Sequence, residues 1–198
     1  MKPSLVPIVE GHAEQASVPV LLRRILASEH FYEVSIARPF RVKRYSVVRP
    51  GELERAVKQA VRSRENAAAV LVILDADDDC PATLGPELLA RCRSSTHLPA
   101  AVVLAQREFE AWLLGAKEAL RGVRGIRQDA TAPSHPEAIR GAKERVSQNM
   151  QGRRYVPVDD QAALAERMDI RLAADRCPSF EKLVREVRRL LCHIHRSP

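Results

Sequence analysis

Aromatic residues are scarce in this chain and long apolar runs are missing, and each shortage excludes a class of function. Only 4% of the 198 residues are Phe, Trp or Tyr, so a surface on which nucleotide bases stack is poorly supported. The single tryptophan, Trp112, is therefore predicted to lie in the core. The apolar stretches Leu5–Val9 and Val70–Leu74 are too short to cross a bilayer, and the N-terminus has no signal-peptide pattern. We expect a cytoplasmic protein that does not enter the membrane.

Motifs for several common chemistries are also missing. The four cysteines are scattered without close pairs, which argues against a disulfide framework and against a C-x-x-C zinc site. The chain has no G-x-x-x-x-G-K-[ST] loop, so it should not hydrolyse ATP in the manner of P-loop proteins. Signatures of serine and cysteine nucleophiles are absent as well.

Charge is plentiful and predominantly positive. The formal net charge of +7 permits a polyanionic partner such as nucleic acid. However, 26 arginines stand against 6 lysines, a skew that a GC-rich genome alone can produce. The basic stretches Arg38–Arg49, Arg121–Arg127 and Arg140–Arg154 could line a track for phosphates, or they could be solvated surface.

Apolar strands alternate with helical segments in the first part of the chain. The runs expected to form buried strands are Leu5–Val9, Ala68–Leu74 and Ala100–Ala105, with a further extended region at Glu33–Val48. The segments with helical periodicity are Ala13–Ser28, Gly51–Asn66, Leu84–Ser94 and Glu108–Lys117, and then, beyond a loop at Arg121–Pro133, Pro136–Ser147, Gln161–Met168 and Pro178–His193. This order predicts an α/β fold with an open, mainly parallel sheet flanked by helices. We expect residues 1–118 to form this core and residues 119–198 to form a helical C-terminal extension packed on it.

Acidic residues follow the predicted strands. Glu10 follows the first strand, Asp75 the second, and Glu108 comes shortly after the third. The carboxyl ends of parallel strands meet at one edge, so these side chains should converge there. Clustered carboxylates repel one another unless a cation neutralises them, and Mg²⁺ or Mn²⁺ suits such oxygen ligands. If the backbone stays extended, Asp77 and Asp79 continue the row begun by Asp75; the alternative is that Asp78 or Asp79 caps the next helix or solvates a turn.

Four short motifs resemble a known family. They are V-E-G-x-x-E at Val9–Glu14, the aspartates of Asp75–Asp79, "EFEAW" at Glu108–Trp112 and "CPSF" at Cys177–Phe180. The first two resemble the signature elements of the Toprim domain, the metal-binding α/β module of topoisomerases, primases and OLD-family nucleases. All four together resemble an uncharacterised bacterial family of Toprim-like proteins, which are often found beside ATPases in presumed phage-defence loci.

The resemblance implies roles for individual residues. Glu10 would be the general acid/base or an indirect metal ligand, and Asp75 and Asp77 would bind Mg²⁺. A second metal site would draw on Glu14, Asp79, Glu108 and Glu110. The chemistry implied is cleavage of phosphodiester bonds by metal-activated water.

Other residues near the motifs admit two interpretations each. Gly11 would let the backbone turn tightly and approach a phosphate, or it is an ordinary strand-to-helix turn. Arg107 is placed to touch a scissile phosphate, or it forms an ion pair with Asp75 or Glu110. If "EFEAW" is helical, Glu108 and Glu110 point to nearly opposite sides and cannot both reach one metal ion.

These patterns lead to one functional hypothesis and two alternatives. The leading hypothesis is a Mg²⁺- or Mn²⁺-dependent nuclease, with Glu10, Asp75, Asp77 and Arg107 in its active site. A non-catalytic subunit, which binds an ATPase partner or a phosphate-bearing ligand, is the first alternative, because 198 residues supply no obvious separate nucleic-acid-binding domain. The second is a phosphatase that uses the same acids on a small substrate.

Overall fold

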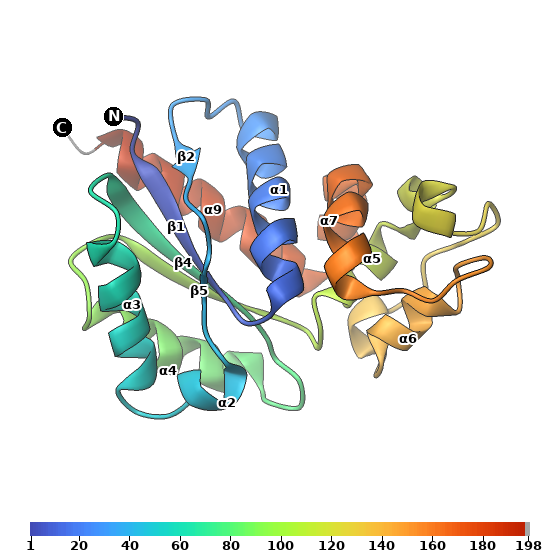
Figure 1. Cartoon of the computed structure of the whole chain (residues 1–198), viewed down its shortest axis with the longest axis horizontal. Helices are drawn as coiled ribbons and strands as arrows, with labels where there is room; N and C mark the ends of the chain where they lie inside the picture. The colour runs from blue at the N-terminus through green and yellow to red at the C-terminus, as the bar shows by residue number, and fades with distance from the viewer. Residues whose placement is uncertain (197–198) are drawn as a thin grey trace.

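A parallel β-sheet forms the centre of the molecule, in a computed structural model that describes residues 1–196 (Figure 1). Its long strands are β1 (Ser4–Val9), β4 (Ala67–Asp75) and β5 (Ala100–Ala105), and the short strands β2 (Ser35–Ile36) and β3 (Phe40–Arg41) both pair with β1. The order is β2-β1-β4-β5, and every pairing is parallel. The predicted α/β fold with a parallel sheet is thus confirmed.

Side chains on alternate strand positions build two hydrophobic clusters, one on each face of the sheet. Leu5 and Leu71 belong to the cluster that α1 (His12–Ser28) and α9 (Pro178–Arg196) complete. Val6 and Val70, which are their neighbours in the sequence, point to the other face and belong to the cluster under α3 (Glu52–Arg62) and α4 (Pro81–Arg93). Both faces are covered, which explains why the strands are apolar at nearly every position.

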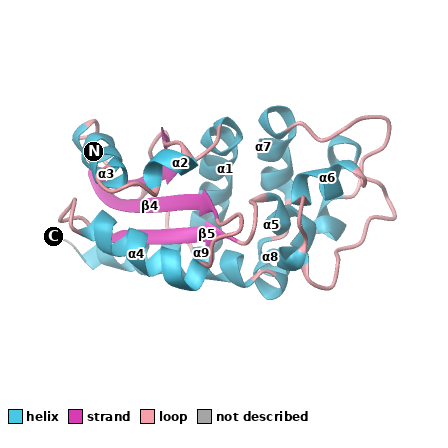
Figure 2. Cartoon of the chain, turned by 90° about the horizontal axis from the view of Figure 1, so that it is seen from below, coloured by secondary structure: helices cyan, strands magenta, loops and turns pink. Residues whose placement is uncertain are grey.

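The remaining helices stand beyond the carboxyl ends of the strands (Figures 1 and 2). They are α5 (Glu110–Gly115), α6 (Ala142–Ser147), α7 (Pro157–Arg167) and α8 (Ile170–Arg176), with the 3-10 turns η1 (Lys117–Leu120), η2 (Val123–Gly125) and η3 (Pro136–Ala138) among them. α7 packs along α1, and α9 returns along β4 and β5. The hydrophobic cluster on the α1 and α9 face of the sheet includes residues from Leu5 to Ile194. Residues 119–196 therefore share a core with residues 1–118.

Three predicted segments differ from the structure. The extended region Glu33–Val48 contains only the two-residue strands β2 and β3, followed by the short helix α2 (Arg44–Val47). The segment Pro136–Ser147 is not one helix, because Gly141 has a φ of 67° and separates η3 from α6. Helix α8 was not predicted at all, although Asp169 caps it by accepting from the amides of Arg171 and Leu172.

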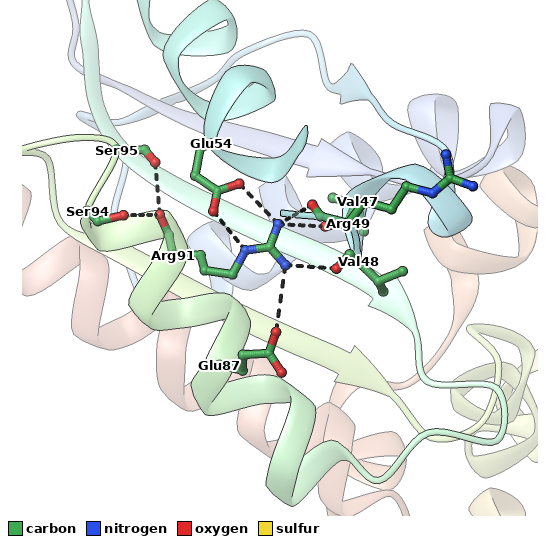
Figure 3. A network of polar contacts seen from close by, with 8 residues as sticks. All are labelled: Val47, Val48, Arg49, Glu54, Glu87, Arg91, Ser94 and Ser95. Atoms are coloured by element: carbon green, nitrogen blue, oxygen red, sulfur yellow. Dashed lines mark hydrogen bonds and ion pairs between the residues drawn. The ribbon is translucent and has the colours of Figure 1, made fainter. Parts of the chain in front are cut away.

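Arg91 on α4 joins three segments on the face that carries α3 (Figure 3). Its guanidinium makes a two-pronged ion pair with Glu54 of α3, with nitrogen–oxygen distances of 2.8 and 3.0 Å. The same group donates to the carbonyl oxygens of Val47, Val48 and Arg49, between α2 and α3. This network fixes the connection between the sheet edge at β3 and helix α3. In the part of the chain that the structure describes, no helix combines the length and apolarity that a transmembrane span requires.

Candidate functional site

The carboxyl ends of β1, β4 and β5 face the helices α5 to α7. Between them, four carboxylates surround one lysine. We call Glu14, Asp75, Glu108 and Glu110, together with Lys143, the carboxylate cluster. Glu14 lies in the first turn of α1, Asp75 ends β4, Glu108 and Glu110 follow β5, and Lys143 lies in α6. Sheet topology and the helical cap together bring these residues to one place.

Asp75 is held rigidly at the end of β4. Its side chain is 15% exposed, and its Oδ1 accepts from the backbone N–H of Phe109 at 2.8 Å. Burial raises the pKa of Asp75 well above its ordinary value, and the nearby carboxylate of Glu110 raises it further, while Lys143 opposes the shift. A buried acid of this kind gains most from a cation placed beside it.

Glu110 is the most deeply buried acid of the carboxylate cluster, with a side chain that is fully enclosed. Its Oε1 accepts from the Tyr155 hydroxyl at 2.9 Å and from Gln161 Nε2 at 3.1 Å. Its Oε2 has no hydrogen-bond partner among the described residues. Burial raises the pKa of Glu110, with Lys143 and the Tyr155 hydrogen bond acting against that shift.

Glu14 folds back over Gly11. A Cβ atom at Gly11 would lie only 2.0 Å from Glu14 Oε2, so the carboxylate occupies the space that any larger residue would need. Glu14 Oε1 is 3.5 Å from Gln161 Nε2, whereas Oε2 is buried without a hydrogen bond to any described residue. The glycine of the V-E-G-x-x-E motif therefore makes room for a carboxylate within this same chain.

Gln161 orients this side of the carboxylate cluster from α7. Its Oε1 accepts from the Ser17 hydroxyl of α1 at 2.6 Å, which leaves its amide nitrogen to donate toward Glu14 and Glu110. The close packing of α7 on α1 thus positions two acids at once. Neither Gln161 nor Tyr155 could be found from the sequence, since nothing marks them as neighbours of acids far away in the chain.

Lys143 occupies the centre of the carboxylate cluster. Its Nζ lies 3.9 Å from Asp75 Oδ2, 4.0 Å from Glu108 Oε2 and 3.9 Å from Glu110 Oε2. Burial alone would lower the pKa of Lys143, but the attraction of Glu110, Asp75 and Glu108 outweighs it, and the net shift is upward. Sequence reasoning missed this lysine within the basic stretch Arg140–Arg154.

Glu108 and Glu110 both lie near the Lys143 ammonium, at 4.0 and 3.9 Å, although we predicted that they would point to nearly opposite sides if both were helical. That prediction assumed that the helix includes both residues, but α5 begins at Glu110. Glu108 lies before the helix and turns toward α6, where it also accepts from the backbone N–H of Lys143 at 3.2 Å. The helical geometry therefore does not apply to this pair.

The aspartates after Asp75 do not continue a row. The backbone leaves the extended conformation at Asp77, which has a φ of 51°, and the intervening Ala76 is fully buried. Asp77, Asp78 and Asp79 are exposed. Neither Asp78 nor Asp79 caps the next helix, because the N-cap residue of α4 is Cys80 and that helix has no side-chain cap. The other alternative, a solvated turn, agrees with the structure: Asp77 and Asp78 lie in an exposed turn, in which the Asp79 N–H donates to the Ala76 carbonyl oxygen. Asp75 is thus the only acid of this motif that belongs to the carboxylate cluster, and metal binding by Asp77 or Asp79 stays a prediction.

Glu10 and Arg107 flank the carboxylate cluster. Glu10 follows β1 directly and is partly buried, four positions before Glu14. Arg107, in the connection between β5 and α5, pairs with Asp78 at 2.6 Å and not with Asp75 or Glu110, the two partners that the sequence suggested. The arginine therefore faces the rim of the carboxylate cluster.

The donor set suits a hard divalent cation, although the present side-chain spacing does not enclose one. Glu14 and Glu110 each offer a buried carboxylate oxygen that lacks a hydrogen bond, and such oxygens are the ligands that Mg²⁺ and Mn²⁺ prefer. Within residues 1–196, no three His, Cys, Asp or Glu side chains lie close enough together to hold a metal ion as they stand. The Lys143 ammonium takes the central position around which the acids are spaced.

Two hollows open beside the carboxylate cluster. The larger, of ≈ 650 Å³, is lined by Lys143 and Tyr155 together with Gln148 and Arg154. The smaller, of ≈ 120 Å³, is lined by Glu108 with Asp77, Asp78, Arg107, Arg140 and Gly141. Each hollow shares one residue with the carboxylate cluster, Lys143 in the larger and Glu108 in the smaller, so a ligand could approach the cluster from two sides.

Fold and site together describe an α/β protein with a parallel sheet and a buried acid–lysine cluster at its carboxyl edge. Comparison with known proteins places the chain in a family: it belongs to the family described as "Domain of unknown function (DUF4276)", whose model matches residues 9–188. No curated protein and no solved structure shows a significant match. The matched range includes every residue of the carboxylate cluster.

Proposed function

We propose that this protein is a metal-dependent nuclease of Toprim type, with the carboxylate cluster as its active site. The observation that carries the proposal is the pair of buried carboxylate oxygens on Glu14 and Glu110 that lack hydrogen bonds, beside the buried Asp75. Buried carboxylate oxygens without hydrogen bonds destabilise a fold, and they are found where a ligand or catalysis requires them. Their placement after β1, β4 and β5 supports the Toprim-like interpretation of the sequence motifs.

Asp75, Glu14 and Glu110 would hold Mg²⁺ or Mn²⁺ in this proposal. The bound metal would activate water and stabilise negative charge on the phosphate oxygens. Glu10, beside this group at the end of β1, would accept or deliver the proton. Lys143 and Arg107 would bind phosphate oxygens and so orient the substrate.

A basic surface next to the end of β1 supports a nucleic-acid substrate over a small phosphate ester. Arg41 of β3 pairs in register with Val9, the residue before Glu10. From there, two adjoining hollows of ≈ 200 and ≈ 740 Å³ share Arg55 and Gln59 and follow α3 outward. Their charged lining residues are the bases Arg41, Lys43, Arg55, Lys58 and Arg62 and the acids Glu52 and Glu54, so the lining has a net positive charge. A chain of phosphates could follow this surface to the carboxylate cluster.

One observation favours the alternative, a non-catalytic subunit that binds an ATPase partner or a phosphate-bearing ligand. Lys143 already places a positive charge among the carboxylates, as a metal ion would. If its ammonium never yields that position, the cluster is a purely structural ion network. The two proposals make opposite predictions for metal binding.

Calorimetric titration of the full chain with Mn²⁺ tests the proposed function. We expect saturable binding in the wild type and in Glu181→Gln, a control at an exposed acid on α9, and loss of binding in Asp75→Asn. Cleavage of single-stranded DNA, duplex DNA and RNA should follow the same pattern in the presence of Mg²⁺ or Mn²⁺. Absence of Mn²⁺ binding and of cleavage in the wild type would refute the nuclease and support the non-catalytic subunit.

A further inference from the structure

Asp78 lies between two arginines at the rim of the carboxylate cluster. Its Oδ1 accepts from Arg107 at 2.6 Å and from Arg140 at 2.6 Å. The three residues come from separate segments: the turn after β4, the connection between β5 and α5, and the loop before α6. Arg107 also donates to the backbone carbonyl of Asp77 at 3.3 Å, which fixes its guanidinium beside that turn.

The two arginines face an open hollow. Arg140 is 70% exposed and Asp78 74% exposed, while Arg107 is anchored with 26% exposure. The hollow of ≈ 120 Å³ that they line also contains Glu108, whose Oε2 is 4.0 Å from Lys143 Nζ. The Asp78 ion pairs are thus accessible to solvent and immediately adjacent to the carboxylate cluster.

Stability does not explain this arrangement well. Exposed ion pairs contribute little to stability, because water screens them and long side chains lose entropy in forming them. Two converging guanidinium groups are also the arrangement that proteins use for phosphate, which offers more oxygens and more charge than one carboxylate. A phosphate group could therefore replace the Asp78 carboxylate between Arg107 and Arg140.

We infer that Arg107 and Arg140 form a clamp for a substrate phosphate, and that Asp78 occupies this clamp until the substrate displaces it. The assignment of that phosphate to a nucleic-acid backbone rests on the proposed function. The clamp itself requires only a phosphate group, which a free nucleotide or inorganic phosphate could also supply. Asp78 acts as an internal competitor, so its removal should strengthen binding.

The test compares affinities of full-length variants in EDTA, where no metal-dependent cleavage occurs. The probes are a fluorescein-labelled single-stranded oligonucleotide and a duplex of the same sequence, measured by anisotropy, and inorganic phosphate as a competitor. Asp78→Asn should bind the oligonucleotide about three- to tenfold more tightly than the wild type, and Arg140→Gln about three- to tenfold more weakly. The salt dependence for Arg140→Gln should fall by about one phosphate contact.

Asp129→Asn is the matched control, because Asp129 also forms an exposed ion pair, with Arg127, and its replacement changes the net charge equally. A gain confined to oligonucleotides identifies the backbone as ligand, whereas an equal gain for inorganic phosphate identifies a small anion. The clamp is refuted if Asp78→Asn binds no better than Asp129→Asn, if Arg140→Gln binds like the wild type, or if no probe binds to any variant. Melting temperatures confirm that each variant is folded.

Failure of the clamp and failure of the proposed function give different results. Mn²⁺ titration and cleavage assays on the same variants depend on the carboxylate cluster. Opposite effects of Asp78→Asn and Arg140→Gln without any Mn²⁺ binding would support the clamp and refute the nuclease. Mn²⁺-dependent cleavage with unchanged affinities in both variants would support the nuclease and refute the clamp.

Discussion

Glu110 shows that a residue can lower the stability of the fold while it contributes a carboxylate to the candidate site. Its carboxylate is enclosed, one of its oxygens has no hydrogen bond among the described residues, and Asp75 and Glu14 bring further negative charge nearby. Lys143 compensates this charge only at a distance of 3.9 Å. Burial of this charge therefore costs stability in the metal-free protein.

Glu110→Gln should therefore stabilise the metal-free protein by about 1 kcal/mol, which corresponds to a rise of about 2–4 °C in melting temperature. Gln keeps an oxygen that accepts from Tyr155 and Gln161 but carries no charge. Differential scanning calorimetry in EDTA provides the measurement. A lower melting temperature than that of the wild type would mean that the ion pair with Lys143 outweighs the burial of the carboxylate.

The stability difference between Glu110→Gln and the wild type should depend on pH, because folding shifts the pKa of Glu110. Folding raises the pKa of Glu110, so the folded protein retains this proton to a higher pH than the unfolded chain, where the pKa is about 4.3. Below the unfolded value both states are protonated and the wild type pays no penalty for the charge. We expect the advantage of Glu110→Gln to be smallest near pH 4 and to grow as the pH rises through the raised, folded pKa.

Helices α3 and α4 are joined by the polar network of Arg91 as well as by apolar packing (Figure 3). The Arg91 side chain is 15% exposed and that of Glu54 is 24% exposed, so the pair is partly protected from water. The hydrogen bond and charge of Arg91 lower the pKa of Glu54 to about 2. The same guanidinium holds three carbonyl oxygens in place between α2 and α3.

Arg91→Met should lower the free energy of unfolding by about 2–3 kcal/mol, since it leaves Glu54 and the carbonyl oxygens without their donor. Arg91→Lys should recover only part of the loss, because an ammonium cannot reach the carboxylate and the carbonyls together. Urea unfolding provides the measurement, with the exposed Arg93→Met on the same helix as control. Equal stabilities of Arg91→Met and Arg93→Met would show that the network contributes nothing.

Acid should weaken the same contact between the two helices. Folding lowers the pKa of Glu54, so its contribution to stability is complete above the unfolded value of about 4.3 and is lost as the pH falls toward about 2. The wild type should therefore lose more stability than Arg91→Met over this range of pH. Parallel pH profiles of the two proteins would contradict the assignment.

At the scale of the whole molecule, the C-terminal residues complete the core on one face of the sheet. Phe180 and Leu190 of α9 are fully buried, and α7 packs along α1. Trp112 lies at the junction, with ring-centre distances of 5.0 Å to Phe109 and 5.3 Å to Phe180. Its Nε1 donates to Ser179 at 2.8 Å, so the prediction that this tryptophan belongs to the core is confirmed.

The shared core predicts that the chain unfolds in a single transition. Trp112 fluorescence reports on the junction between the sheet and the C-terminal helices, while far-ultraviolet circular dichroism reports on all helices. The two signals should give the same midpoint in urea, because neither part can keep its apolar face buried alone. A fluorescence change well before the loss of helix would show instead that residues 119–196 detach from the sheet.

The sequence by itself determined the order and type of the main elements. The continuous apolar runs that became β1, β4 and β5 predict strands buried on both faces, and the helices between them require parallel pairing. It also determined that Glu10, Asp75 and Glu108 lie at the carboxyl edge, because parallel strands end on the same side. These inferences use local patterns and one rule of topology, which need no knowledge of distant contacts.

The tertiary structure alone decided which residues complete the site. Lys143, Tyr155 and Gln161 reach Glu110 from segments 33 to 51 positions away, and no local pattern encodes such a contact. It also decided that the chain turns at Asp77 instead of continuing as a strand, because Asp77 has a left-handed backbone with a φ of 51°. Local periodicity specifies elements, whereas the partners of a buried charge depend on how the whole chain packs around it.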